Sequence, residues 1–405
     1  ALQGNPNLGV AQARLRRAQA FSEAASAATL PQVNGALDLT RQRYTENGAV
    51  PAPLAGSVRE TGTLQLSTSW EIDFFGKNRA AIAAAVGATR AADADVAAAR
   101  VVLAANVARS YFQLVRLNEQ ATVARRTLAQ REAQLRLVQQ RVGAGLDTAL
   151  ELRQSEGALP EARQQIEALQ EQAQLARNTL AALVGQPELQ LAAVPALQAM
   201  PAASTLPSLP VNLLGRRADI AAARWRVEAA TQDISVAKAQ FYPNVNLTAF
   251  LGLSSIGLNQ LLDAGSMQWG VGPAVRLPIF DAGRLRANLR GKTADLDAAV
   301  DSYNAAVLEA VHETADAATT LQSLARQQAE QRQAASAAEA AYQIAVQRYE
   351  AGLGTFLHVL AAETAVLNQR RQGVDLAARV LDTRVALYRA LGGGWGADAT
   401  SVAAH

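Results

Sequence analysis

The feature that most constrains the fold is an internal duplication that relates the two halves of the chain. The segment Arg141–Thr148 matches Arg348–Thr355 at an offset of 207 residues. The same offset carries Gly76 and Lys77 onto Gly283 and Arg284, and the segment that ends at Gly185 onto the segment that ends at Gly392. Three landmarks that share one offset are not a chance agreement, so the chain is one structural unit written twice.

Each half follows the same order: a helix, two alternating strands, a very long helix, a glycine turn and a second long helix. Near the first strand, Leu30–Asn34 matches Tyr242–Asn246 at an offset of 212, so the first half has five extra residues in a loop. We therefore predict a first repeat at 1–186, with a helix at about 5–29, strands at 33–41 and 62–73 and a helical hairpin at 79–186. A Pro-rich linker at 187–210 follows. The second repeat at 211–392 has a helix at about 213–240, strands at 244–254 and 268–280 and a hairpin at 286–392, and a tail at 393–405 ends the chain.

The predicted strands alternate between apolar and polar side chains. This period of two leaves one face of a sheet apolar and the other in water. The runs have about 9–11 residues, the length with which a tilted strand crosses a bilayer. An ordinary half-buried sheet would show the same alternation strand by strand. The residues that we expect to face lipid are Leu64, Leu66, Trp70, Val245, Leu247, Leu251, Trp269 and Val271, with the two tryptophans near the membrane interfaces.

The long helices are the second unusual feature. Residues 79–141 and 286–348 contain no proline, and each stretch would be about 95 Å long as a helix. The return helix after Thr148 repeats apolar residues at alternating spacings of three and four, which is typical of supercoiled helix pairs. Pro160 lies inside it and should kink it. A plain intracellular coiled coil would explain these helices but not the strands.

Charge and composition exclude several function classes. The chain has 38 Lys and Arg against 35 Asp and Glu, a net charge of +3, without the clustered basic excess of a nucleic-acid-binding surface. It has no cysteine, and no run of 18 apolar residues that would form a membrane-spanning helix. His312, His358 and His405 lack metal-ligand spacing, and no nucleophile and base pair is visible. We expect no enzyme activity, cofactor or metal.

Four strands cannot close a barrel, and an open sheet with an apolar face would expose unpaired backbone to lipid. The chain should therefore oligomerise through its strands, with the polar faces lining water. The segments 209–220, 241–246, 277–284 and 348–353 resemble TolC-type outer-membrane factors of tripartite efflux pumps, within their lipoprotein (NodT-like) branch.

This resemblance implies a mainly α fold with a smaller β part: a homotrimer with a 12-stranded outer-membrane β-barrel, continued by a long periplasmic α-helical barrel. It also implies a periplasmic adaptor (membrane fusion) protein and a proton-driven inner-membrane transporter as partners, and a role in antibiotic resistance. One departure from relatives is Ala218, where they usually have proline. Because the chain begins without Met, we expect a mature product, and any lipidated N-terminal Cys of relatives would lie upstream.

The predicted function is a passive, gated exit duct in the outer membrane for drugs or other small substrates. The alternative is a soluble coiled-coil scaffold or adaptor protein, which would need no detergent for extraction. Glycine turns between the long helices should form the tips that dock the adaptor, because glycine adopts the positive φ that reverses a chain. The predicted tip residues are Val142, Gly143, Gly145, Leu146, Thr148, Tyr349, Gly352, Leu353, Gly354 and Thr355, and Phe356 is expected to be exposed beside them.

The predicted gate lies where the helices end. The offset of 207 carries Glu151 onto His358, so three copies would alternate a carboxylate and an imidazole around the tip. These groups attract when the imidazole is charged, so we expect a duct held more tightly shut at mildly acidic pH. Asp147 and Arg348 are expected helpers. The alternative is that both side chains point into solvent on the outer wall.

Overall fold

The structure is a computed structural model that describes residues 1–187, 191, 197 and 216–394. Most of the predicted linker at 187–210, the predicted helix start at 213 and nearly all of the predicted tail at 393–405 lie outside the described residues. The chain divides into two compact units, and each unit combines segments from both repeats: unit 1 comprises 1–12, 94–221 and 305–405, and unit 2 comprises 13–93 and 222–304.

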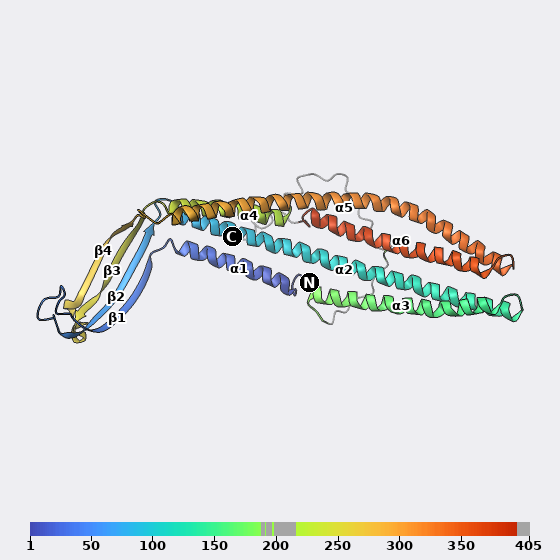
Figure 1. Cartoon of the computed structure of the whole chain (residues 1–405), viewed down its shortest axis with the longest axis horizontal. Helices are drawn as coiled ribbons and strands as arrows, with labels where there is room; N and C mark the ends of the chain where they lie inside the picture. The colour runs from blue at the N-terminus through green and yellow to red at the C-terminus, as the bar shows by residue number, and fades with distance from the viewer. Residues whose placement is uncertain (188–190, 192–196, 198–215, 395–405) are drawn as a thin grey trace. The chain divides into compact units, whose positions relative to one another are not determined.

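Unit 2 contains a four-stranded antiparallel sheet with the order β1-β2-β3-β4 (Figure 1). Its central pair, β2 with β3, joins the first repeat to the second. The strands are β1 (Gln32–Arg43), β2 (Val58–Ile72), β3 (Asn244–Ile256) and β4 (Met267–Arg276), with two short 3-10 helices, η3 (Leu258–Gln260) and η4 (Ala264–Ser266), between β3 and β4. Helix α1 (Pro6–Ala27) precedes β1, and α4 (Ala218–Ala239) precedes β3.

Strand β4 ends at Arg276, four residues before the end predicted from the alternation. Pro278 follows, and its ring nitrogen has no hydrogen to donate to a ladder. Asp281 then begins the next helix, because its side chain accepts hydrogen bonds from the backbone N–H groups of Gly283 at 3.0 Å and Leu285 at 2.8 Å. The segment between strand and helix therefore has a defined turn of its own.

Two helical hairpins account for most of the chain (Figure 1). The first consists of α2 (Lys77–Gly143) and α3 (Ala149–Val184), and the second of α5 (Arg284–Glu350) and α6 (Phe356–Ala390). The outgoing helices α2 and α5 have 67 residues each, which corresponds to about 100 Å. Helix α3 continues through Pro160. Among the described residues, no helix has a stretch apolar enough to cross a membrane.

The core of unit 1 is built from small and medium side chains along the hairpins. Within the first hairpin, Leu114, Leu117 and Ala121 of α2 form a buried cluster with Ile166 and Leu169 of α3. Alanines at such positions let helices pack closely along their length. At the turn end, a second buried cluster joins the two hairpins; its members are Val138, Tyr342, Tyr349, Phe356, Val359 and Val366.

An ion-pair network in unit 1 anchors the start of α4. The Arg217 side chain is only 8% exposed, and its guanidinium pairs with Asp219 and with Glu313 of α5, both at 2.7 Å. Arg217 also donates to the carbonyl of Ala390 at the end of α6. Arg389 completes the network by pairing with Glu313. A buried guanidinium with all these acceptors holds three helices in register.

Candidate functional site

One face of the sheet is apolar along most of its length. Residues opposite each other in neighbouring strands share a face, and Leu64 lies opposite both Leu37 and Leu253. This apolar sheet face includes all the residues predicted to face lipid. It consists of Val33, Leu37, Leu39, Leu64, Leu66, Trp70, Ile72, Val245, Leu247, Leu251, Leu253, Met267, Trp269, Val271 and Val275.

The opposite face of the same sheet is mainly polar. On β2 it presents Gln65, Ser67, Ser69 and Glu71, and across the register Asn246 lies opposite Glu71. Lys77, at the start of α2, pairs with Glu71 at 2.7 Å and partly neutralises it. The sheet therefore has one apolar face and one mainly polar face.

The apolar sheet face has a limited height. Toward the end away from the helices, Arg41 of β1 pairs with Glu60 of β2 at 3.7 Å, on the same side of the sheet. Toward the helix end, the indole N–H of Trp70 donates to the carbonyl of Thr29 at 2.8 Å. Trp269 lies opposite Leu251, at the level of Leu66 in the middle of β2. An indole at the limit of an apolar band, as at Trp70, is typical of a membrane interface.

The sheet is open at both edges. The strand order leaves β1 and β4 with one neighbour each within the part of the chain that the structure describes. Apolar side chains are most exposed on these edge strands: Val33 is 68% and Trp269 is 70% exposed, whereas Leu247 on β3 is 38% exposed. An open edge carries unpaired backbone groups that bind another strand readily and that lipid cannot satisfy. The surface is incomplete in a single chain.

The two tip turns, residues 142–148 and 349–355, have the same backbone geometry. Gly145 and Gly352 have φ values of 72° and 71°, a left-handed conformation that favours glycine. The N–H of Leu146 bonds to the carbonyl of Arg141 at 2.9 Å, and that of Leu353 to Arg348 at 2.8 Å, as in a Schellman motif. Each turn presents an apolar side chain, because Leu146 and Leu353 are 66% and 69% exposed.

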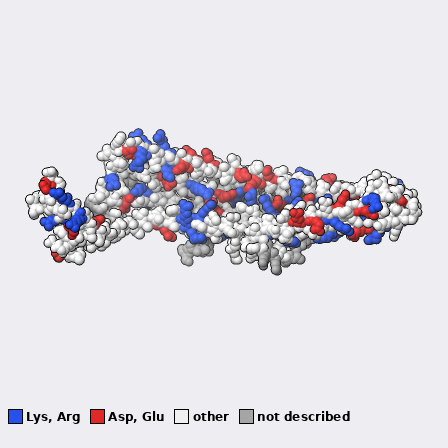
Figure 2. Space-filling model, turned by 60° about the horizontal axis from the view of Figure 1, so that its bottom comes forward, with Lys and Arg blue, Asp and Glu red and all other residues white. Residues whose placement is uncertain are grey.

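Exposed leucines also follow both tip turns. Leu150 and Leu357, one helical turn after Leu146 and Leu353, are 62% and 67% exposed. Along the hairpins, acidic and basic side chains are interspersed on the face shown in Figure 2, while the turn end is mostly uncharged. These four leucines, in two equivalent pairs, are exposed apolar side chains of the kind found at protein contacts.

Glu151 and His358 each contact the start of their own helix. Glu151 closes a capping box, accepting from both the backbone N–H and the hydroxyl of Thr148. These bonds lower the pKa of Glu151, with the Thr148 hydroxyl contributing most. His358 Nδ1 lies 3.0 Å from the hydroxyl of Thr355. Arg348 donates to the carbonyl of Leu353 within its own turn. In the described single chain, the predicted gate residues Glu151 and His358 are not paired with each other.

Asp147, predicted as a helper of the gate, instead connects the two hairpins. It pairs with Arg141 at 2.9 Å, and the hydroxyl of Tyr349 on the second hairpin donates to it. Arg141 also lies 4.5 Å above the ring of Tyr349. Burial opposes ionisation of Asp147, but the hydrogen bonds from Arg141 and Tyr349 outweigh burial and lower its pKa. Burial, followed by the hydrogen bond to Asp147, raises the pKa of Tyr349. We call these three residues the tip network.

Two expectations for the tips need correction. Tyr349, predicted to dock a partner, is only 2% exposed, and Phe356, expected to be exposed, is also 2% exposed. The rings of the two residues pack at 5.6 Å within the cluster that joins the hairpins. Burial of these large aromatic side chains stabilises the hairpin junction and removes them from the docking surface.

A ladder of charges joins α2 to α6 along the hairpins. Arginines lie on α2 and carboxylates on α6: Arg109 pairs with Asp382 at 3.2 Å and Arg116 with Asp375 at 3.3 Å. Nearer the tips, Arg370 of α6 reverses the polarity and bonds to Gln130 of α2 and to Glu339 of α5. This ladder sets the register of the two hairpins.

The last member of the ladder is a buried carboxyl. Glu363 is 3% exposed, and its Oε2 lies 3.4 Å from the Arg131 Nε, while its Oε1 has no hydrogen-bond partner. Arg131 is shared, because it also donates to the carbonyl of Ala158 at 2.8 Å and lies 3.8 Å from Glu161. Desolvation therefore dominates and raises the pKa of Glu363, with Arg131 opposing it. Sequence patterns did not single out this residue.

The match to known proteins covers both repeats. The family model described as "Outer membrane efflux protein" matches residues 1–186 and 209–393. The chain belongs to this outer membrane efflux protein family. It is an outer-membrane channel of tripartite efflux systems, with a periplasmic extension. Members of the family are transport channels, and channels of this kind work with an adaptor and an inner-membrane pump.

Relatives of this outer membrane efflux protein match along nearly the whole length of this chain. The pyoverdine export outer membrane protein OpmQ of Pseudomonas aeruginosa is 35% identical over 409 residues, covering 100% of this chain and 85% of OpmQ. The putative multidrug resistance outer membrane protein MdtQ of Escherichia coli K12 is 34% identical, covering 98% of this chain and 84% of MdtQ. The crystal structure of the outer membrane protein VceC from Vibrio cholerae superposes with a TM-score of 0.89 at 38% identity, covering 98% of this chain and 95% of VceC.

Proposed function

We propose that three copies of the chain close a 12-stranded barrel. Its apolar sheet face contacts outer-membrane lipid, and its polar face lines a water-filled duct that the helical hairpins continue through the periplasm. The observation that supports this proposal is a sheet with one apolar face, one polar face and two unpaired edges. Barrels of about eight strands are filled by side chains, so a lumen needs more strands. The family resemblance implies the number of three copies.

The mass of the detergent-extracted protein tests this assembly. One chain has a mass of 42.6 kDa, and the proposal predicts a particle of three times that mass that needs detergent to stay in solution. A monomer or dimer that remains soluble without detergent would contradict the duct and favour a soluble coiled-coil scaffold.

We propose that the duct is shut at the tip turns and that the tip network holds each subunit in the shut arrangement. Opening would separate the second hairpin from the first, which breaks the contact between Tyr349 and Asp147. Pairing of Glu151 with His358 of a neighbouring copy stays a prediction. If this pairing contributes to closure, His358→Ala should change the pH dependence of conductance in planar bilayers. An unchanged profile would show that the tip network and apolar contacts alone keep the duct shut.

We propose that the exposed leucines of the tip turns, with Leu146 and Leu353 at their centre, dock the periplasmic adaptor. Gly145→Val and Gly352→Val would distort the turns, because valine is strained at positive φ. We expect these variants to form trimers but to lose drug resistance in cells. Gly157→Val is the control, since Gly157 lies within α3 in open space. Unchanged resistance of both tip variants would show that the adaptor docks elsewhere.

A further inference from the structure

The duplication supplies an internal template for the contact between copies. Inside one chain, the end of the first repeat meets the start of the second where β2 pairs with β3, and Ile72 lies opposite Val245 there. The offset of 207 carries Ile72 onto Ile279, and the offset of 212 carries Val245 onto Val33. The same pair of residue types therefore occurs a second time, at the two open edges of the sheet.

The two versions of this pair differ in exposure. Ile72 and Val245 are half-buried, because each covers the other across the β2–β3 ladder. Ile279 is 93% and Val33 is 68% exposed. Ile279 and the adjacent Phe280, at 88%, are the most exposed large apolar side chains among the described residues. Ile72 is covered by the neighbouring strand β3, whereas no strand of the same chain covers Ile279 among the described residues.

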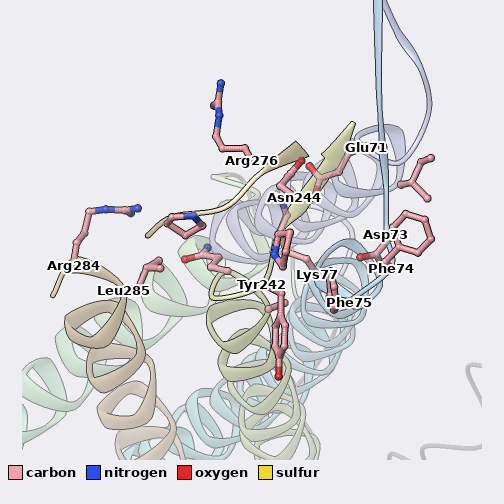
Figure 3. A pocket seen from close by; sticks show the side chains of 15 residues that line it. Glu71, Asp73, Phe74, Phe75, Lys77, Tyr242, Asn244, Arg276, Arg284 and Leu285 are labelled. Carbon is pink, nitrogen blue, oxygen red and sulfur yellow. Dashed lines mark ion pairs between the residues drawn. The ribbon is translucent and has the colours of Figure 1, made fainter. Parts of the chain in front are cut away.

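Tyr242, which lies in the surroundings of Ile72 (Figure 3), has an exposed counterpart beside β1. Close to Ile72, the ring of Phe75 stacks on Tyr242 with 4.8 Å between centroids, beside a hollow of about 320 Å³ where β2 and β4 end and α2 and α5 begin. Leu30 occupies the position equivalent to Tyr242 and is 61% exposed. Leu30, exposed beside β1, thus matches a position that is in contact within the chain.

We propose that β4 of one copy pairs with β1 of the next copy in the register of β2 with β3. Val275 then lies opposite Leu37 of that next copy, and Ile279, three residues beyond the end of β4, lies beside its Val33. The partner is a second copy of this chain, and the inference rests on the proposed trimer. All four residues belong to the apolar sheet face or continue it, so the contact extends that face without a break around the barrel.

A competing register aligns the strand ends and places Val275 opposite Val33. The two registers differ by four residues, and an even shift keeps apolar side chains on one side of the sheet in both. The apolar pattern alone therefore does not distinguish them. The competing register leaves Ile279 beyond the start of β1, where no strand residue covers it, and this counts against it.

Disulfide cross-linking measures the register directly, because the chain has no cysteine of its own. Three double variants of the full chain are expressed in a Gram-negative outer membrane and oxidised: Val33→Cys with Ile279→Cys, Leu37→Cys with Val275→Cys, and Val33→Cys with Val275→Cys. A four-residue slip displaces side chains by about 13 Å, whereas a disulfide requires Cα atoms less than about 7 Å apart. Each single-cysteine variant is a control.

We expect the first two pairs to give covalent dimers and trimers on non-reducing gels, which a reductant returns to monomers, while the third pair stays monomeric. Cross-linking of the third pair alone would overturn the proposed register and leave the trimer intact. Absence of cross-links in all pairs would also overturn it if the particle has the mass of a trimer. The same result with a monomeric particle would refute the proposed assembly itself.

Discussion

Removing the hydroxyl of Tyr349 should open the duct. The Tyr349→Phe substitution keeps the ring that packs on Phe356 and lies under Arg141. It removes the hydrogen bond to Asp147, which joins residues 202 positions apart on the two hairpins. Asp147 keeps its ion pair with Arg141 inside the first hairpin. The fold of each tip turn should therefore survive while the hairpins separate more easily.

The size of the effect follows from burial and charge. Tyr349 is 2% exposed and the Asp147 side chain 10% exposed, so water competes little for this bond. A hydrogen bond to a charged group contributes about 1.5–3 kcal/mol. Since about 1.4 kcal/mol corresponds to a factor of ten, the ratio of separated to joined hairpins should rise about 10-fold to about 150-fold in each subunit.

Single-channel recording in planar bilayers measures this ratio as the fraction of time in the conducting state. Tyr388→Phe is the matched control, because Tyr388 is 54% exposed and therefore accessible to water. We expect a large rise in open time for Tyr349→Phe and none for Tyr388→Phe. Equal open times in Tyr349→Phe and the unmodified protein would show that opening does not separate the hairpins at the tip network.

Three further predictions concern other parts of the chain. Burial raises the pKa of Glu363, so its carboxyl binds a proton more tightly when the hairpins are joined. The joined state should therefore gain stability as pH falls through the raised pKa and lose stability as pH rises through it. Glu363→Gln should flatten this part of the conductance–pH profile. In variants that retain only Trp70 or only Trp269, lipid-attached quenchers at shallow depth should quench the tryptophan fluorescence. A variant that retains only Trp225 of α4 is the control and should not be quenched. Absence of quenching at both strand tryptophans would refute the assignment of the apolar sheet face to lipid. Arg217→Met should lower stability by about 2 kcal/mol, because it removes the hydrogen bonds that the buried guanidinium donates to Glu313 and to the carbonyl of Ala390. An unchanged thermal melting temperature would refute that role.

Much of the sheet could be predicted from the sequence, because its determinants are local. Alternation along each strand places Leu64 and Leu66 on one face whatever the neighbouring strand is, and the observed registers bring such residues into one surface. The end of β4 was overestimated because the alternation continues through Leu277 and Ile279. Pro278 and the turn held by Asp281 end the strand earlier.

The tip network could not be predicted in the same way. Its bond between Tyr349 and Asp147 joins two hairpins, and a period of 3.5 residues identifies the buried side of a helix but not which residues of another hairpin lie against it. Tyr349 and Phe356 were assigned to the surface because glycine turns are usually exposed. Glu363 was missed because a single carboxylate among apolar seam residues resembles a solvated position until its burial is known.

The central claim is that the two faces of one sheet contact lipid and water, respectively. Adjacent positions of β2 test it most directly, because Leu66 and Ser67 point to opposite faces and the chain has no other cysteine to react. In outer-membrane vesicles, a charged maleimide should label Ser67→Cys and leave Leu66→Cys unmodified until the membrane is dissolved. Equal labelling of both variants in intact vesicles would contradict a sheet that separates lipid from a water-filled duct.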